Sequence, residues 1–244
     1  MKTRVVSIDL WRTVFDPYCE VSSSVARKKL VADYAACYGF TDKARLDEEY
    51  EKTTRLFYDT YKDGAVTLTP RERLASQLDR VKIPHDGEDF EELINAVELS
   101  ILDNPPSLSP NLPEALERLS KHFDLAIVSD TGFSPGRVIR QLFEKYGIAK
   151  RFRDYSFSDE NRVAKPDPIA FISVYDRLGV SPSECSECWH VGDLEWTDVK
   201  GAKAIGAHAC LYTGINSSDD NSTQADFVLE DWAHVSQLID LIQG

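Results

Sequence analysis

Four polar side chains of this sequence are placed where they could act on one ligand. Asp9 lies in the apolar segment 5–10, Ser129 and Asp193 follow the apolar segments 125–128 and 189–191, and Lys165 lies in the loop after 155–157. Asp and Ser, taken singly, are ordinary turn residues. Around one crevice, however, the two carboxylates would repel each other, and a divalent cation such as Mg²⁺ would relieve that repulsion. Carboxylates, Mg²⁺ and a lysine around one point form a natural site for a phosphoryl group.

The elements around these side chains predict how they meet. From residue 105 onward, apolar strand-like segments alternate with helical ones, which indicates right-handed crossovers and a Rossmann-like parallel sheet covered on both faces. Ligands of such α/β sheets bind at the carboxyl ends of the strands. The strands are expected at 5–10, 125–128, 155–157, 189–191, 209–212 and 225–229, and the helices at 113–122, 135–146, 168–178, 197–205 and 232–242.

Residues 16–104 have a different pattern from the rest of the chain. Apolar residues recur at helical spacing in four stretches (21–38, 43–61, 70–81 and 89–102), and no strand-like segment interrupts them. The Asn104-Pro105-Pro106 sequence then breaks the pattern. We therefore expect residues 1–15 and 105–244 to form one α/β domain, interrupted after its first strand by a helical bundle at 16–104.

Composition narrows the class of protein. The 244 residues include 28 Lys and Arg against 41 Asp and Glu, a formal charge of −13, which disfavours binding to nucleic acid. No apolar run is long enough to span a bilayer, so no membrane association is predicted. The odd number of cysteines, five, and the lack of an export signal predict reduced thiols and a cytoplasmic location. The sequence indicates no oligomeric state.

The four polar positions belong to motifs that resemble those of the haloacid dehalogenase superfamily, in family order and over essentially the whole chain. The superfamily's best-populated branch is Mg²⁺-dependent phosphatases, and its helical-bundle cap domain matches the insert after the first motif. The motifs are DLWRTVFD at 9–16, AIVS at 126–129, KPDP at 165–168 and VGDLEWTDVKGA at 191–202.

The resemblance implies a role for each motif residue in a phosphatase acting on a small phosphate ester. Asp9 would attack phosphorus and form an aspartyl-phosphate. Ser129 and the backbone N–H groups of Asp130 and Thr131 would bind the phosphoryl oxygens, and Thr13 would hold the loop after Asp9. Lys165 would neutralise negative charge on Asp9 and the phosphoryl group. Mg²⁺ would be bound by Asp9, the Trp11 carbonyl, Asp193 and, directly or indirectly, Asp198.

Trp11 departs from the phosphatase pattern. Phosphatases of this superfamily have a second Asp at this position as the general acid and base, and an indole cannot exchange a proton near neutral pH. Losing a general acid typically costs about 10²- to 10⁴-fold in rate. Arg12 also replaces a small residue, commonly Gly.

Two alternatives to the phosphatase follow from Trp11. Metal-independent 2-haloacid dehalogenases have Tyr at this position, but they have Ser at the position of Asp193, which favours a metal site here. A weakly active binding protein with the same fold is the other alternative. In the cap, Lys28, Lys29, Arg71 and His85 could touch a substrate, but solvated surface is the favoured interpretation for all four.

Overall fold

Six parallel strands form the central sheet of the computed structural model, which describes residues 5–17, 23–64, 67–216 and 222–244. Their order is β5-β4-β1-β6-β7-β8, so β1 lies between β4 and β6. This arrangement confirms the predicted α/β fold with a parallel sheet. The strands are β1 (Val5–Ile8), β4 (Asp124–Ser129), β5 (Phe152–Phe157), β6 (Cys188–Gly192), β7 (His208–Tyr212) and β8 (Phe227–Leu229).

Helices cover both faces of the sheet because successive strand residues point to opposite sides. Val6 and Ile8 of β1 pack in the apolar cluster with α5, α6 and α10, whereas Val5 packs in the cluster with α8 and α9. The helices of this part are α5 (Leu112–Leu119), α6 (Gly136–Lys145), α7 (Ser158–Asn161), α8 (Pro168–Arg177), α9 (Lys200–Ala204) and α10 (Val235–Gln243).

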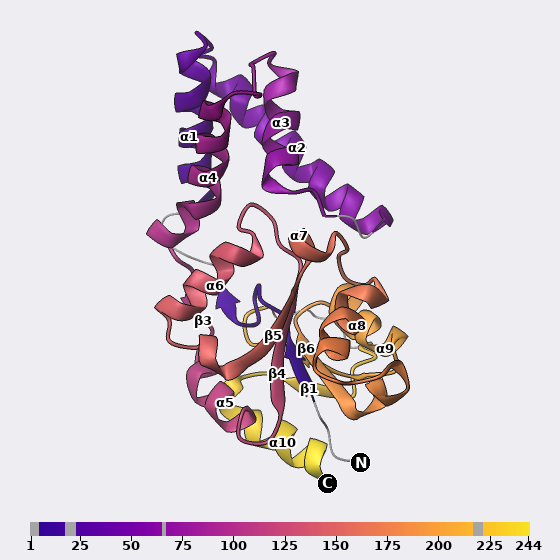
Figure 1. Cartoon of the computed structure of the whole chain (residues 1–244). Helices are drawn as coiled ribbons and strands as arrows, with labels where there is room; N and C mark the ends of the chain where they lie inside the picture. The colour runs from indigo at the N-terminus through magenta and orange to yellow at the C-terminus, as the bar shows by residue number, and fades with distance from the viewer. Residues whose placement is uncertain (1–4, 18–22, 65–66, 217–221) are drawn as a thin grey trace.

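Four further helices stand together away from the sheet (Figure 1). Their apolar sides form a separate core that includes Val31, Leu74, Phe90 and Val97. Within the described ranges, no helix is long and apolar enough to cross a membrane. The four helices are α1 (Ser23–Cys37), α2 (Lys43–Gly64), α3 (Pro70–Arg80) and α4 (Glu88–Asp103), close to the predicted stretches.

A short antiparallel ribbon joins the chain segments that lead into and out of these helices. It consists of β2 (Phe15–Asp16) and β3 (Ser107–Leu108), with Phe15 opposite Leu108. The sequence did not predict this ribbon, because two-residue strands have too few residues to show a periodic pattern. The division of the chain at residues 15/16 and 104/105 therefore falls inside β2 and just before β3, and it remains a proposal.

Side chains from the sheet part also contact the four helices. Phe133, in the loop after β4, is buried within the apolar core of α1–α4 and stacks on Tyr50 of α2 with ring centroids 5.5 Å apart. Arg162, just after α7, donates to Glu72 of α3 at 2.8 Å. The loop after β4 therefore belongs to the packing of both parts of the molecule.

Glu72 provides a test of this contact. Its carboxylate accepts from the Thr69 backbone N–H at the start of α3 and from Arg162, and these bonds lower its pKa from 4.5 to about 2. Glu72→Gln should lower the free energy of unfolding by about 1 kcal/mol at pH 7. Because the folded pKa lies below the unfolded one, the contribution of Glu72 is fully present above pH 4.5 and is lost as pH falls toward 2.

Urea denaturation of the wild type and of this variant at pH 7 and pH 3 measures the effect. We expect the difference in unfolding free energy to shrink at pH 3. The exposed Glu92 of α4 gives the control variant Glu92→Gln, which should match the wild type at both pH values. A Glu72→Gln difference that is equal at both pH values would contradict this interpretation.

Candidate active site

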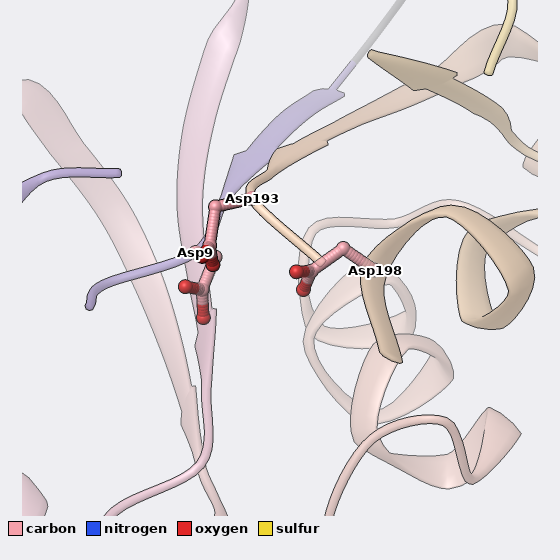
Figure 2. A group of neighbouring side chains, drawn as sticks. All are labelled: Asp9, Asp193 and Asp198. Atoms are coloured by element: carbon pink, nitrogen blue, oxygen red, sulfur yellow. The ribbon is translucent and has the colours of Figure 1, made fainter. Parts of the chain in front are cut away.

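Asp9 and Asp193 follow two neighbouring strands, β1 and β6. The chain proceeds from β1 outward through β4 to β5 and then returns to β6 on the other side of β1, so the strand order reverses between these two strands. In open α/β sheets, ligands bind in the crevice at such a point. One carboxylate oxygen each of Asp9, Asp193 and Asp198 lies within 4.8 Å of the others, and Figure 2 shows the three side chains gathered at this place.

Lys165 joins this group from the loop before α8. Its ammonium donates to Oδ1 of Asp9 at 2.5 Å and to Oδ1 of Asp198 at 2.6 Å, and all three side chains are buried. The backbone N–H of Lys165 donates to Asp130 at 2.9 Å, which fixes its loop against the end of β4. The structure thus brings the predicted lysine into direct contact with the predicted nucleophile.

Asp198 is held by protein donors on both of its oxygens. It lies in a π-helical turn (Glu195–Val199), where Oδ2 accepts the Leu194 backbone N–H at 2.9 Å. Besides Lys165, Oδ1 contacts Nε2 of the buried His190 at 3.1 Å, and Nδ1 of that histidine contacts the Ser7 hydroxyl at 2.8 Å. These contacts suit Asp198 to the indirect role, that of holding Lys165, rather than to direct ligation.

The pKa values of the three buried carboxylates are shifted in different directions. Burial raises the pKa of Asp9 well above its ordinary value, and Lys165 only partly opposes this. Burial, with repulsion from Asp198, raises the pKa of Asp193 to about 6. For Asp198, attraction to Lys165 and hydrogen bonding from His190 outweigh burial and hold the pKa below its ordinary value. The Lys165 ammonium thus contacts two of the three buried carboxylates, Asp9 and Asp198. Asp193 forms no ion pair among the described residues, and the group fits an additional cation.

Two buried hydroxyls near these carboxylates have no hydrogen-bond partner among the described residues. They are Oγ of Ser129, the last residue of β4, and Oγ1 of Thr13, in the loop after β1. A buried hydroxyl without a partner costs free energy, so such groups commonly serve a ligand. The backbone carbonyl of Thr13 accepts from Ser109 at 2.7 Å and from Trp232 at 3.0 Å, which anchors the loop.

The structure corrects one expected phosphoryl-binding group. The backbone N–H of Thr131 donates to the Ser158 hydroxyl at 2.8 Å, and the Thr131 hydroxyl donates to Asp159 at 2.7 Å. Thr131 is fully buried and therefore holds the loop against α7 instead of facing a ligand. Asp130, by contrast, lines the cavity described next.

A cavity of about 590 Å³ extends from these residues to the four helices. Trp11 lines it, half-buried, with its ring 6.1 Å from that of Phe15. Arg12 also lines it and has a φ of 60°, the left-handed region that favours glycine. That conformation accounts for the small residue expected at the position of Arg12.

Sequence reasoning missed several contributors to this region. His190 lies inside an apolar strand, where a histidine gives no signal that separates it from core packing. Asn216 donates to Asp193 at 3.1 Å from a loop far along the chain. Arg27 and Arg73 line the cavity from α1 and α3, while the neighbouring candidates Lys28 and Arg71 form ion pairs with Glu51 and Glu91.

Comparisons with known proteins bear on this site. Residues 6–206 match the family model of haloacid dehalogenase-like hydrolases. A phosphoglycolate phosphatase of Vibrio parahaemolyticus is 30% identical over 138 residues, which are 55% of this chain and 56% of that protein. The chain thus spans about half the length of this curated relative.

Solved structures share the fold over nearly the full chain. A 2-haloacid dehalogenase from Pseudomonas syringae has a TM-score of 0.69 at 20% identity, with 99% of each chain covered. A phosphatase from Thermococcus onnurineus has a TM-score of 0.67 at 20% identity, with 98% of each chain covered. At such identities the likeness concerns the fold alone, and the family model adds the sequence match over most of the chain. On these grounds the chain belongs to the haloacid dehalogenase-like hydrolases.

Proposed function

We propose that this protein is a Mg²⁺-dependent phosphatase that acts on a small phosphate ester. The observation that carries the proposal is the buried group of three carboxylates at the carboxyl ends of β1 and β6, two of which bind the ammonium of Lys165. The phosphatase name of the Vibrio relative supports the same class of substrate. Phosphoryl transfer mainly requires positioning and neutralisation of charge, which this set of side chains can provide.

In the proposed reaction, Asp9 is the nucleophile. A carboxylate oxygen of Asp9 forms a bond to phosphorus while the ester P–O bond breaks and the alcohol oxygen leaves with its electron pair. Water then hydrolyses the aspartyl-phosphate and regenerates Asp9. Lys165 keeps Asp9 oriented and stabilises its negative charge, and the Ser129 hydroxyl and the N–H of Asp130 donate to the phosphoryl oxygens.

Asp9, Asp193 and the backbone carbonyl of Trp11 would hold Mg²⁺, with Asp198 keeping Lys165 in place. Oxygen donors are the ligands that this ion prefers. When bound, Mg²⁺ neutralises charge on the phosphoryl group. Two like charges about 5 Å apart repel by roughly 3 kcal/mol at an effective dielectric constant of ~20, so the cation also relieves repulsion within the protein.

The aromatic side chain of Trp11 is the feature that favours a second candidate, a 2-haloacid dehalogenase. In that reaction Asp9 would attack carbon and a halide ion would leave, so no general acid would be needed. Asp193 argues against it, because Asp198 already holds Lys165 and a metal-independent reaction gives no role to a third buried carboxylate beside the nucleophile. Release of halide from a 2-haloacid in the presence of a chelator would establish the dehalogenase.

The first prediction from the proposed function concerns Asp9. Asp9→Asn should lower phosphatase turnover by at least 10³-fold, because the amide is a poor nucleophile, and should leave the melting temperature close to that of the wild type. Hydrolysis of p-nitrophenyl phosphate and a thermal melt measure the two effects. The exposed Asp176 on α8 gives the control variant Asp176→Asn, which should keep full activity. Wild-type turnover by Asp9→Asn would refute the assignment.

The second prediction concerns the metal. Activity should vanish with a chelator and return with Mg²⁺. Asp193→Asn should weaken Mg²⁺ binding at least tenfold in titration calorimetry, because it removes a ligand charge, whereas Asp176→Asn should bind Mg²⁺ like the wild type. Phosphatase activity that a chelator does not change would contradict the proposed metal site.

The third prediction concerns the leaving group. Without an acid at the position of Trp11, the alcohol oxygen must leave unaided or take its proton from water. Aryl and acyl phosphates should therefore react much faster than alkyl phosphates, and the logarithm of kcat/KM should fall steeply with the pKa of the leaving alcohol. A series of phosphate esters of graded leaving-group pKa provides the measurement.

Trp11→Asp supplies the matched comparison for that series. It should raise alkyl-ester turnover relative to aryl-ester turnover, and Trp11→Phe, which adds no acid, should leave the ratio as it is. If the wild-type rates do not depend on the pKa of the leaving alcohol, another residue supplies the proton to the leaving oxygen, and this interpretation of Trp11 is wrong.

A further inference from the structure

A chain of three polar side chains connects α8 to Asp198 through the interior of the protein. Ser7 of β1 stands directly opposite His190 of β6 in the parallel register. The Ser7 hydroxyl lies 2.7 Å from the hydroxyl of Tyr175 on α8 and 2.8 Å from Nδ1 of His190. Because Nε2 of His190 lies 3.1 Å from Oδ1 of Asp198, the chain ends on the carboxylate that binds Lys165.

The strand residues beside this chain are apolar. Val5, Val128 and Ala209 lie on the same face of the sheet, in the cluster that α8 and α9 cover. All three polar side chains are completely buried there. Buried polar groups cost free energy unless each is hydrogen-bonded, and apolar side chains could fill such a place without that cost. The chain therefore points to a task beyond packing.

The direction of each hydrogen bond follows from the number of protons. Asp198, held as a carboxylate by Lys165, only accepts, so Nε2 of His190 carries a proton and donates. A second proton, on Nδ1, would place another buried cation beside Lys165 on the same carboxylate oxygen, which is costly. Nδ1 is therefore an acceptor, and the single proton of the Ser7 hydroxyl points to it. Tyr175 must then donate to Ser7, and burial raises the pKa of Tyr175, so the phenol keeps its proton.

One other acceptor competes for the Ser7 proton. The backbone carbonyl of Trp189 lies 3.3 Å from the Ser7 hydroxyl, farther than Nδ1 of His190 at 2.8 Å. If the proton pointed to this carbonyl, two lone pairs would face each other across the shorter contact. The bond to His190 is therefore the favoured one.

The helix α8 links the chain to Lys165 a second time. Lys165 lies in the loop that leads into α8, and Tyr175 lies about two turns along that helix. Phe171, about one turn before Tyr175, meets the ring of His190 edge-on, with ring centroids 5.0 Å apart. The helix that follows the lysine loop thus also holds the histidine that supports the partner of the lysine.

We propose that Ser7 and Tyr175 are positioning residues for the reaction at Asp9. Their hydrogen bonds fix His190 in the tautomer that donates to Asp198, and that carboxylate holds the ammonium beside the nucleophile. This inference rests on the proposed phosphatase function. Both hydroxyls lie outside the lining of the cavity. Their loss should therefore lower kcat, through the orientation of the ammonium, and leave KM close to its wild-type value.

NMR reads the tautomer of His190 directly. In a long-range ¹H–¹⁵N correlation spectrum of the full chain at pH 7, His190 should appear as a neutral ring with its proton on Nε2. The chain has five histidines, and the signal that is lost in His190→Gln assigns this one. A ring protonated on Nδ1, alone or together with Nε2, would overturn the inference, because Nδ1 could not accept from Ser7.

Kinetics of p-nitrophenyl phosphate hydrolysis provide the second readout. Ser7→Ala should lower kcat about tenfold, with KM within about twofold of the wild type, because it removes the donor to Nδ1. Tyr175→Phe leaves that donor in place and should lower kcat less, about threefold. Ser7→Thr, which keeps the hydroxyl, should retain more of kcat than Ser7→Ala.

Ser156 of β5 gives the matched control. Its buried hydroxyl also donates to α8, to the carbonyl of Ala170 at 2.5 Å, but it has no contact with His190. Ser156→Ala should lower the melting temperature and keep the wild-type kcat. An unchanged kcat in Ser7→Ala, or an equal loss in Ser7→Ala and Ser156→Ala, would overturn this inference and leave the proposed function intact. If the wild type hydrolyses no phosphate ester, the proposed function fails, and this inference fails with it.

Discussion

The contact on which the site depends is the buried ammonium of Lys165 between Asp9 and Asp198. It is the cation that holds Asp9 in place, and its position is fixed by a carboxylate that the neighbouring turn and His190 already constrain. Loss of Lys165 would leave both carboxylates without this ammonium, and removing such a partner from a buried ion pair commonly costs about 3–5 kcal/mol. The position of Asp9, the proposed nucleophile, therefore depends on the same ammonium that stabilises this end of the sheet.

The fold makes this contact possible by bringing distant segments to one edge. β1, β4 and β6 lie side by side, so residues 9, 129 and 193 meet although more than a hundred residues separate the first from the second. The parallel register needs long crossovers, and the helical insert between β1 and β4 is one of them. The same connection that completes the sheet thus also supplies the walls of the cavity.

Much of this arrangement could be predicted from the sequence, because it depends on patterns that the chain displays locally. Apolar segments precede Asp9, Ser129 and Asp193. In a parallel sheet the carboxyl ends of the strands lie at the same edge, so these residues are expected to meet. The role of His190 could not be predicted, since a buried histidine in a strand looks the same whether it packs or supports a carboxylate. Thr131 was assigned wrongly because a backbone N–H near a site can equally serve its own loop, as the bond to Ser158 shows.

The arginines of the cavity were missed for a geometric reason. Adjacent residues of a helix point about 100° apart, so Arg27 and Lys28 differ completely in surroundings although they are neighbours in sequence. Which of them faces the cavity depends on how α1 packs against Phe133, a residue 106 positions further along the chain. That loop also carries Asp130, so the residue that contacts the arginines and the proposed phosphoryl-binding residue lie in one segment. A change in the packing of Phe133 would therefore alter the surroundings of both arginines and of Asp130, and the four helices contact the sheet part through this loop.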